Sequence, residues 1–529
     1  MDRSRADLNE VSGAAGRGRR AALPAPLVVM GFIAGLFVRA AYAFPAHKYV
    51  PDADSLNMGL RALAVLNGDL VVFFSGAQIG ALEAYLHAAA FSIFGASREA
   101  ISLAPLLVGC ATLVVFYLFI KEVFGSRVAE LSLLFLALPS PAFLAWTYMP
   151  NSYPETVFLS AATLWLSARM GVRGFDRWSA VGLGLSAGLG WWNSPLTLAA
   201  TLPAVLWLLK ARPESRRISF WRLPAVGFLV GALPWIAYNV RYRFPSIFQV
   251  VRPVGEGNAI GAAAGKLLGE NVPQLAIGMD PFGGGAALND VQRLVRIPAA
   301  IVFLAAAALL VLRAVKGDRR IREGLLLLGL VAAVTAGLFV FSSSGTFPGP
   351  TVRYILPLAF VFAAALGLAT DFVGRRNRLA MLAVAVPVLA FNLSGYYWPW
   401  TTQRREWQRN ARSDENLIAF LEKQKIAFVL GEYWTAYPVN FLSTLEVRGV
   451  PVQSQFDFYR IGDTLPARAA RFALISRDAG EIRFWASQIG IDGQISEIGP
   501  GYLLLPVSST DSSTRTVNGL RNAISAEVH

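Results

Sequence analysis

Long apolar runs alternate with short basic segments over most of the first 400 residues. Because a membrane-spanning helix needs about 20 mostly apolar residues, this pattern predicts eleven spans. The fifth and sixth are short and flank Trp191-Trp-Asn-Ser-Pro195, which favours a broken or re-entrant pair. The spans are expected at residues 24–44, 100–120, 128–146, 153–169, 179–191, 195–210, 224–240, 297–314, 324–342, 353–373 and 379–396.

The positions of Lys and Arg orient this array of spans. Basic residues cluster at alternate connections, whereas the short loops 147–152 and 343–352 contain none. Because cytoplasmic loops are enriched in Lys and Arg, we expect residues 1–23 to form a cytoplasmic basic tail and the C-terminus to lie outside. Ala41-Tyr-Ala43 resembles a signal-peptide cleavage site. The preceding segment is long enough to span and carries Arg39, which favours an uncleaved anchor.

Two connections, both expected outside the cytoplasm, are longer than the others. The first loop (residues 45–99) contains amphipathic patterns at Ser55–Leu66 and Ala81–Phe94, which predict helices lying in the membrane interface. The long loop (residues 241–296) is rich in glycine and is expected to be mobile.

The pattern changes after Trp400. Residues 401–507 predict a small extracytoplasmic α/β domain, and the Ser/Thr-rich tail at 508–529 is expected to be disordered. The predicted elements are helices at 414–423, 436–445 and 481–489, strands at 426–430 and 472–475, and a hairpin around 499–501.

Composition supports a polytopic α-helical membrane protein. The chain has 55% hydrophobic and 16% charged residues, whereas soluble domains carry about 25% charged residues. The net charge of +14 is divided among short clusters between apolar runs, which fits membrane topology and not a nucleic-acid groove. The single cysteine, Cys110, lies inside an apolar run, so an intrachain disulfide is excluded and a cysteine zinc site has no support.

Several acidic side chains fall on the expected outer side. Asp52 and Asp54 in the first loop have the chemistry of a general base or of cation ligands. In the alternative interpretation, Asp54 caps the following helix and Asp52 is a solvated loop acid. Glu155 follows a proline where the fourth span begins, which is also ordinary helix-start chemistry. Glu83 could belong to the polar face of an interfacial helix.

The basic candidates on the same side are Arg39, Arg241, Arg243 and Arg353. Arg353 precedes Tyr354 at the entrance of a late span, on the side where Lys and Arg are disfavoured, so it predicts an anionic partner such as a lipid phosphate or a carboxylate. The alternative is an interfacial arginine beside a belt tyrosine. The histidines lack metal-ligand spacing, and no phosphate-binding loop, nucleophile elbow or dinucleotide fingerprint is present. Acids and arginines from separate loops together predict a pocket for an anionic, lipid-linked substrate.

The order of these motifs over residues 36–360 resembles the GT-C-type membrane glycosyltransferases. The nearest group is that of the protein mannosyltransferases and aminoarabinose transferases (family 39-like). The segments that carry the resemblance are Arg39, Asp52-Ala-Asp54, Asn67-Gly-Asp-Leu70, Leu82-Glu-Ala-Tyr-Leu-His-Ala88, Phe94-Gly-Ala-Ser97, Lys121-Glu-Val-Phe-Gly125, Tyr153-Pro-Glu155, Gly231-Ala-Leu-Pro-Trp-Ile-Ala-Tyr-Asn239 and Arg353-Tyr-Ile-Leu-Pro357.

The resemblance implies that residues 24–400 form a catalytic membrane domain in the bacterial inner membrane. It would transfer a hexosyl or pentosyl group, with inversion, from a polyprenyl-phosphate donor to a lipid, glycan or protein acceptor on the outer face. An acid of the first loop is the base in that family, which implies Asp54 or Asp52 here, with Asp54 favoured. Glu155 would line the site, and Arg353 would face the donor phosphate. The other substrate-binding candidates are Tyr153, Tyr354, Glu83, Arg39, Arg241 and Arg243.

The chain also departs from the family pattern. The mannosyltransferases have two adjacent acids where this chain has Asp52-Ala-Asp54, so the matching aspartate is open. An Asp-x-Asp motif can bind a divalent cation but need not. The WWDYG peptide-binding signature of oligosaccharyltransferases is missing, because Tyr396-Tyr-Trp-Pro-Trp400 lacks the acid, and asparagine-linked transfer is not expected.

Two other classes of protein share part of this pattern. A lipid or sugar transporter or flippase also uses broken helices and membrane arginines, but usually places its charged sites near the midplane and has two related halves. Here the ionisable residues gather at one face, and the sequence shows no repeat. A non-catalytic assembly partner that binds through its C-terminal domain is the other alternative.

Overall fold

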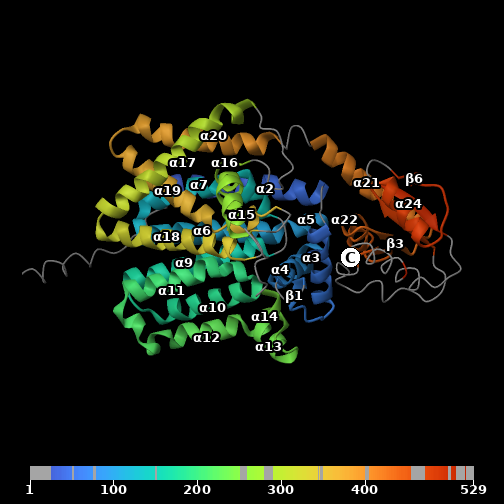
Figure 1. The fold of residues 1–529 in the computed structure, drawn as a ribbon, viewed down its shortest axis with the longest axis horizontal. Coiled ribbons are helices and arrows are strands. Elements are labelled where there is room, and N and C mark those ends of the chain that lie inside the picture. Colours follow the sequence, from blue (N-terminus) through green and yellow to red (C-terminus); the bar gives the residue numbers. More distant parts are fainter. Residues whose placement is uncertain are drawn as a thin grey trace, which may run out of the picture.

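The computed structural model describes residues 26–49, 53–75, 79–148, 152–250, 259–278, 290–342, 345, 350–398, 404–453, 471–498, 502–507 and 519, and structural statements below refer to these. Figure 1 shows a body of long helices with a smaller α/β unit, coloured orange and red, at one end. We call this unit, from α21 to β7, the C-terminal unit.

The helical body is built from apolar helices that coincide with the predicted spans. Its helices are α2 (Pro26–Tyr49), α6 (Leu103–Phe124), α7 (Ser126–Ala137), α8 (Pro141–Trp146), α9 (Tyr153–Arg173), α10 (Arg177–Asn193), α11 (Leu198–Ala211), α12 (Arg222–Gly231), α13 (Leu233–Arg241), α17 (Asp290–Lys316), α18 (Arg319–Val340), α19 (Leu358–Gly374) and α20 (Arg378–Trp398). Each predicted span falls on one helix or on two consecutive helices.

In the part of the chain that the structure describes, fewer helices than the eleven predicted spans meet the length and hydropathy expected of a membrane-spanning helix. Within the described residues, five helices are long and apolar enough to cross a membrane, and a sixth span results if Ile218–Gly231 and Leu233–Arg241, bent by 64°, count as one. A multi-pass helical membrane fold is therefore confirmed, and the count of eleven stays a prediction.

Small residues allow the closest helix contacts in the body. A Cβ at Gly184 of α10 would lie 1.8 Å from the carbonyl oxygen of Pro224 in α12, and one at Gly227 of α12 would lie 2.2 Å from the carbonyl oxygen of Val181. Such approach of two backbones is typical of helix pairs in membranes. It holds α10 and α12 in direct contact beside α9.

The long loop differs from its prediction. Part of the segment that was expected to be mobile forms α14 (Pro245–Val250), α15 (Ala259–Lys266), a π-helical turn η4 (Leu267–Asn271) and α16 (Val272–Ile277). The physical reason is burial of apolar side chains, because Leu267 and Leu275 belong to the core of the body. The glycines at 283–285 lie outside the described residues.

The first loop forms α3 (Ala53–Leu66), the antiparallel pair β1 (Phe73–Ser75) and β2 (Ile79–Gly80), α4 (Leu82–Phe94) and α5 (Arg98–Ile101). The two helices lie where the amphipathic patterns predicted them. Their apolar faces differ from the prediction, however, because they pack against protein. Leu56 and Leu60 of α3 and Phe91 of α4 share a buried core with Phe428 and Phe441 of the C-terminal unit.

The C-terminal unit contains a five-stranded sheet in the order β4-β3-β5-β7-β6. Strands β4, β3 and β5 are parallel, β7 is antiparallel to β5, and β6 is antiparallel to β7. Every residue of β3 and β5 is buried, as expected of strands covered on both faces. The elements are α21 (Arg404–Lys423), β3 (Phe428–Gly431), α22 (Tyr433–Ala436), α23 (Pro438–Leu442), β4 (Arg448–Pro451), β5 (Phe472–Ser476), α24 (Ala479–Gln488), β6 (Ser496–Glu497) and β7 (Leu503–Val507).

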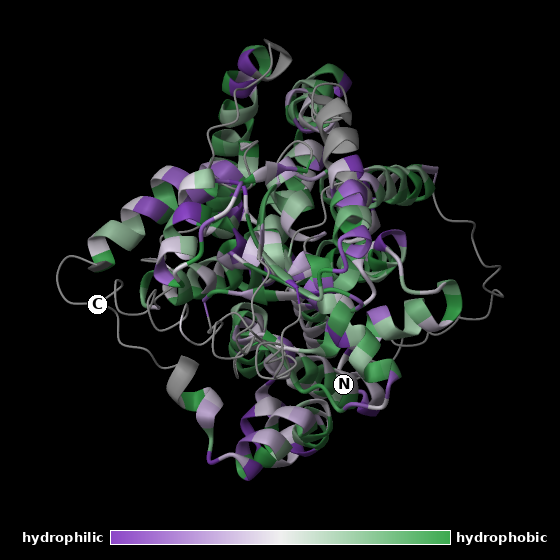
Figure 2. Cartoon of the chain, turned by 90° about the vertical axis from the view of Figure 1, so that its right-hand side faces the viewer, coloured by the Kyte–Doolittle hydropathy of each residue, from purple (hydrophilic) through white to green (hydrophobic). Residues whose placement is uncertain are grey.

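The C-terminal unit is docked on the first loop by close packing and by an ion pair. A Cβ at Gly59 of α3 would lie 2.6 Å from Cε2 of Phe441, so glycine permits this approach. Arg98 lies 3.2 Å from Asp414, which also accepts a hydrogen bond from the Tyr502 hydroxyl at 2.8 Å. Figure 2, viewed from the side of this unit, shows hydrophobic residues along the helices of the body and hydrophilic residues mixed into the nearer elements.

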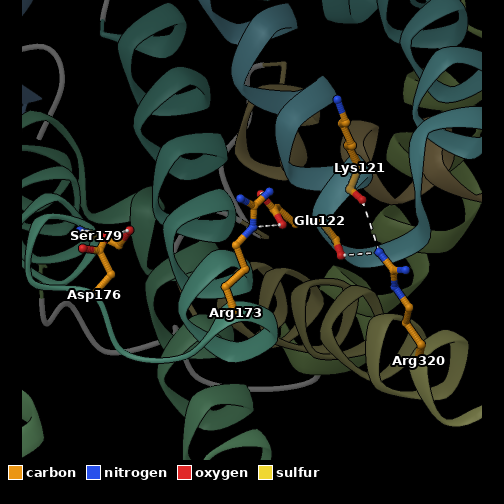
Figure 3. A network of polar contacts seen from close by, with 6 residues as sticks. All are labelled: Lys121, Glu122, Arg173, Asp176, Ser179 and Arg320. Atoms are coloured by element: carbon orange, nitrogen blue, oxygen red, sulfur yellow. Dashed lines mark hydrogen bonds and ion pairs between the residues drawn. The ribbon is translucent and has the colours of Figure 1, made fainter. Parts of the chain in front are cut away.

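The far ends of the helices, where the basic clusters lie, are joined by arginine side chains (Figure 3). Arg173 forms an ion pair with Glu122 near the end of α6, and its Nε donates to Glu122 Oε2 at 2.8 Å. Arg320 donates to the carbonyl oxygens of Val123 at 3.0 Å and Glu122 at 2.9 Å. Arg320 therefore satisfies carbonyls at the C-terminus of α6, where cations are favoured, and Arg173 pairs with a carboxylate beside it.

Candidate active site

Asp54 lies at the start of α3, where the first loop meets the C-terminal unit. The helix begins at Ala53, so Asp54 is its second residue and half-buried. The alternative in which Asp54 caps a helix that begins at Ser55 is therefore wrong. A carboxylate in the first turn is stabilised by the backbone N–H groups and dipole of the helix. Asp52 lies outside the described residues.

Tyr433 of α22 covers the carboxylate of Asp54. Its hydroxyl donates to Asp54 Oδ1 at 2.8 Å and lies 3.4 Å from the amide Nδ2 of Asn57, which is one turn further along α3. Burial of Tyr433, and then the charge of Asp54, raise the pKa of the Tyr433 hydroxyl above its ordinary value. The hydroxyl therefore stays protonated and acts as a hydrogen-bond donor to the carboxylate.

Arg353 lies in η6 (Val352–Ile355), which precedes α19, and is held by aromatic rings. Its guanidinium lies 5.1 Å from the ring centroid of Trp146 and 5.0 Å from that of Tyr354. It also donates to the Tyr354 hydroxyl at 3.1 Å. Cation–π contacts at this distance are attractive and leave the positive charge in place.

The structure brings Asp54, Arg353 and Tyr153 together from three distant segments. Asp54 and Tyr153 both interact electrostatically with Arg353, and Asp54 also acts on Tyr153. Tyr153 begins α9, is 8% exposed and packs edge-on against Trp146 with the centroids 5.6 Å apart. A carboxylate and a guanidinium thus act on the same region of the protein. The carboxylate could accept a proton there, and the guanidinium could stabilise a negative charge.

Glu83 and Glu155 form a second acidic pair, deeper in the protein. Glu83 is 0% exposed, in place of the polar helix face that was predicted, and its Oε2 accepts the backbone N–H of Ser152 at 2.8 Å. Its Oε1 lies 3.4 Å from Nε2 of His87. Glu155 is 1% exposed and interacts electrostatically with Glu83, and neither of its oxygens has a hydrogen-bond partner among the described residues. A buried carboxylate without hydrogen bonds is unfavourable, so Glu155 suits a position that receives a substrate group or shares a proton.

The other predicted arginines lie elsewhere. Arg39 is 2% exposed, and its guanidinium donates to the carbonyl oxygens of Ala137 at 2.9 Å and Leu136 at 3.0 Å, at the C-terminus of α7. Arg241 and Arg243 are exposed at and beyond the end of α13, and no contact described in the structure joins either to Asp54 or Arg353. The structure therefore gathers only Arg353 of the four at this site.

Sequence reasoning missed Tyr433, Asn57 and Trp146. Trp146 fell inside a predicted span, and Tyr433 lies in a separate domain, so neither carried a local signal. Among the described residues, no group of three or more His, Cys, Asp or Glu side chains could hold a metal ion. Because Asp52 lies outside the described residues, a divalent cation at Asp52-Ala-Asp54 stays a prediction.

Comparison with known proteins gives a family model and a fold to which this chain is similar. Residues 81–238 match the family model of dolichyl-phosphate-mannose-protein mannosyltransferase. No curated protein matches the sequence significantly. The fold is similar to that of ArnT from Cupriavidus metallidurans bound to undecaprenyl phosphate, with a TM-score of 0.62 and 15% identity over 90% of this chain and 97% of that chain. For the apo state of the same protein the TM-score is 0.59 and the identity 16%, with the same coverage.

The structural similarity, at these identities, concerns the fold, and the family match lies inside the segment whose motifs carried the resemblance. The resemblance of this chain to the GT-C-type membrane glycosyltransferases is therefore confirmed, in sequence over residues 81–238 and in fold over nine-tenths of its length.

Proposed function

We propose that this protein is an inverting membrane glycosyltransferase that moves a hexosyl or pentosyl group from a polyprenyl-phosphate donor to an acceptor outside the cytoplasm. The acceptor is a lipid, glycan or protein of the cell envelope. The observation that carries the proposal is that Asp54 from the first loop lies within electrostatic range of Arg353 from the segment before α19. The family match and the ArnT-like fold support a glycosyltransferase of this type.

The proposed reaction assigns one role to each side of this site. An acceptor hydroxyl attacks the anomeric carbon of the donor, its proton passes to the carboxylate of Asp54, and the bond from that carbon to the phosphate oxygen breaks. The phosphate leaves with the bonding electrons. The Arg353 guanidinium stabilises that charge. A leaving group that is already anionic needs such electrostatic stabilisation more than it needs protonation. Glu155, Tyr153 and Tyr354 line the same site.

The membrane-borne donor follows from the proposed orientation. With the basic clusters in the cytoplasm, Asp54, Arg353 and the C-terminal unit lie outside, where nucleotide sugars are not made. A polyprenyl-phosphate donor carries its sugar to that face, and undecaprenyl phosphate is the molecule bound to ArnT in the structure that this fold resembles. The apolar outer surface of the helices, including Ile33, Phe37 and Leu304, suits contact with membrane lipid.

The test begins by identifying the donor. Profiling lipid-linked sugars in a strain that lacks the protein should show which donor accumulates, and transfer from that purified donor is then measured with the parental protein. Asp54→Asn keeps the shape of the side chain and removes its basicity. We expect transfer to fall by about 10²-fold or more, with expression and donor binding near normal. Asp492→Asn, at an exposed aspartate in the C-terminal unit, is the matched control and should remain active.

The alternatives give different results in the same assay. Loss of activity in Asp52→Asn, with Asp54→Asn active, would exchange the two assignments. Inhibition by EDTA together with loss in both variants would indicate a cation at the pair. Full activity of both variants would remove the first-loop acids from the reaction and contradict the proposal.

A further inference from the structure

The C-terminal unit contributes a side chain directly to the candidate active site. Tyr433 and Asp54 are 379 residues apart in sequence, and their hydrogen bond is 2.8 Å long. Tyr433 is 3% exposed and Asp54 is half-buried, so this bond is largely shielded from water on the tyrosine side. Figure 1 shows α22 beside α3, and the two helices are in contact.

The fold holds the Tyr433 ring rigidly over α3. Strand β3 is the middle one of the three parallel strands and ends at Gly431. Tyr433, two residues later, is the first residue of α22. Its ring lies 5.2 Å from that of Tyr437 and 5.1 Å from that of Trp434. It belongs to the core shared with Leu56 of α3. The position of the hydroxyl is therefore fixed by the sheet and not by a mobile loop.

We propose that Tyr433 is a positioning residue for Asp54, so that docking of the C-terminal unit on the first loop completes the active site. This inference rests on the proposed function, because it assumes that Asp54 is the base.

The hydrogen bond has two effects on a general base. It fixes the orientation of the carboxylate by holding Oδ1. It also favours the ionised form of the carboxyl group, because a donor to a carboxylate stabilises its charge. The charged and titratable groups that act on Asp54 include Tyr433 of α22, Arg353 of η6 and Tyr153 of α9. Arg353 favours the same ionised form, so it is kept unchanged in the test.

The experiment compares two tyrosines that make the same kind of bond. Tyr433→Phe removes the bond to Asp54 and keeps the ring in its core. Tyr502→Phe removes a 2.8 Å bond to Asp414 in the same unit, away from Asp54. The dependence of kcat/KM on pH is measured for both variants and for the parent, with thermal unfolding in detergent as the check on folding.

For Tyr433→Phe we expect the acidic limb of the kcat/KM profile to move to higher pH by about one unit or more, since the lost bond is to a charged group. On that limb the rate should fall by about 10-fold. Tyr502→Phe should leave the limb in place, even if it lowers the unfolding temperature as much.

Two results would overturn the inference. The first is a Tyr433→Phe protein that folds and has the parental pH profile. The second is an equal displacement in Tyr502→Phe, which would assign the effect to the stability of the unit. The proposed function is tested separately by Asp54→Asn: inactivity of that variant together with a normal Tyr433→Phe protein leaves the function standing and removes only the positioning role.

Discussion

Replacement of Arg353 by alanine is expected to slow sugar transfer by about 10²-fold or more. The guanidinium is proposed to stabilise the charge that develops on the donor phosphate as the glycosidic bond breaks. Removal of one group that stabilises a developing oxyanion costs about 10²–10³ in rate, or about 2.7–4 kcal/mol. Arg353 is positioned for such a role at the site that also contains Asp54.

The loss of rate in Arg353→Ala has two contributions, one from the missing charge and one from the missing contacts with aromatic rings. The guanidinium lies 5.1 Å from the ring of Trp146 and 5.0 Å from that of Tyr354, and such contacts contribute about 0.5–2 kcal/mol depending on exposure. Alanine removes both the charge and these contacts. Lysine keeps the charge but lacks the planar, two-pronged donor geometry, so Arg353→Lys should recover only part of the rate.

The assay is single-turnover transfer from the purified lipid-linked donor, together with donor binding and thermal unfolding in detergent. Arg319→Ala is the control, because that side chain is 84% exposed at the far end of the body and forms only an i,i+4 pair with Glu323. Transfer by Arg353→Ala at the parental rate would refute the reasoning and return Arg353 to an anchoring role at the membrane interface. Full activity of Arg353→Lys would show that a point charge suffices.

Two further predictions concern topology and the buried arginine of α2. A reporter that is active only outside the cytoplasm, fused after Val507, should give a signal, because Lys and Arg cluster on the opposite side; a cytoplasmic readout would overturn the orientation. Arg39→Met should lower the free energy of unfolding by about 1–3 kcal/mol, because it leaves the buried carbonyls of Leu136 and Ala137 without their donor. Unfolding in detergent measures this loss, and unchanged stability with weaker donor binding would instead support the substrate-binding role predicted from the sequence.

The helices of the first loop could be located from the sequence because their signal is local. The amphipathic patterns at 55–66 and 81–94 coincide with α3 and α4 within two residues. What covers their apolar faces depends on segments far along the chain. The pattern therefore placed these faces in the membrane interface, whereas Leu56, Leu60 and Phe91 pack against the C-terminal unit.

The candidate site was predictable only where a residue stood out against its surroundings. Arg353 did so, as an arginine on the side of the membrane where basic residues are scarce. Arg39 gave a similar signal, but its carbonyl partners in α7, 97 and 98 residues away, could not be predicted. Tyr433 gave no signal, because a tyrosine after a strand is common in sequences. Its role becomes visible only in the structure, where the C-terminal unit packs on α3.

The way in which each arginine is held distinguishes a structural role from a binding role. At the far end of the body, Asp371 lies 2.8 Å from both Arg127 and Arg375, so both guanidinium groups are held by one carboxylate there. Arg353 interacts with the charge of Asp54, and the rings of Trp146 and Tyr354 in addition orient its guanidinium without cancelling its charge. A phosphate that enters beside Arg353 therefore meets a cation whose orientation is already fixed, so little ordering remains to be done on binding. The same rings would be less effective around lysine, whose flexible stem and compact charge do not stack. Arginine at position 353, flanked by Trp146 and Tyr354, thus suits the anionic oxygen pair of the proposed donor phosphate better than lysine would.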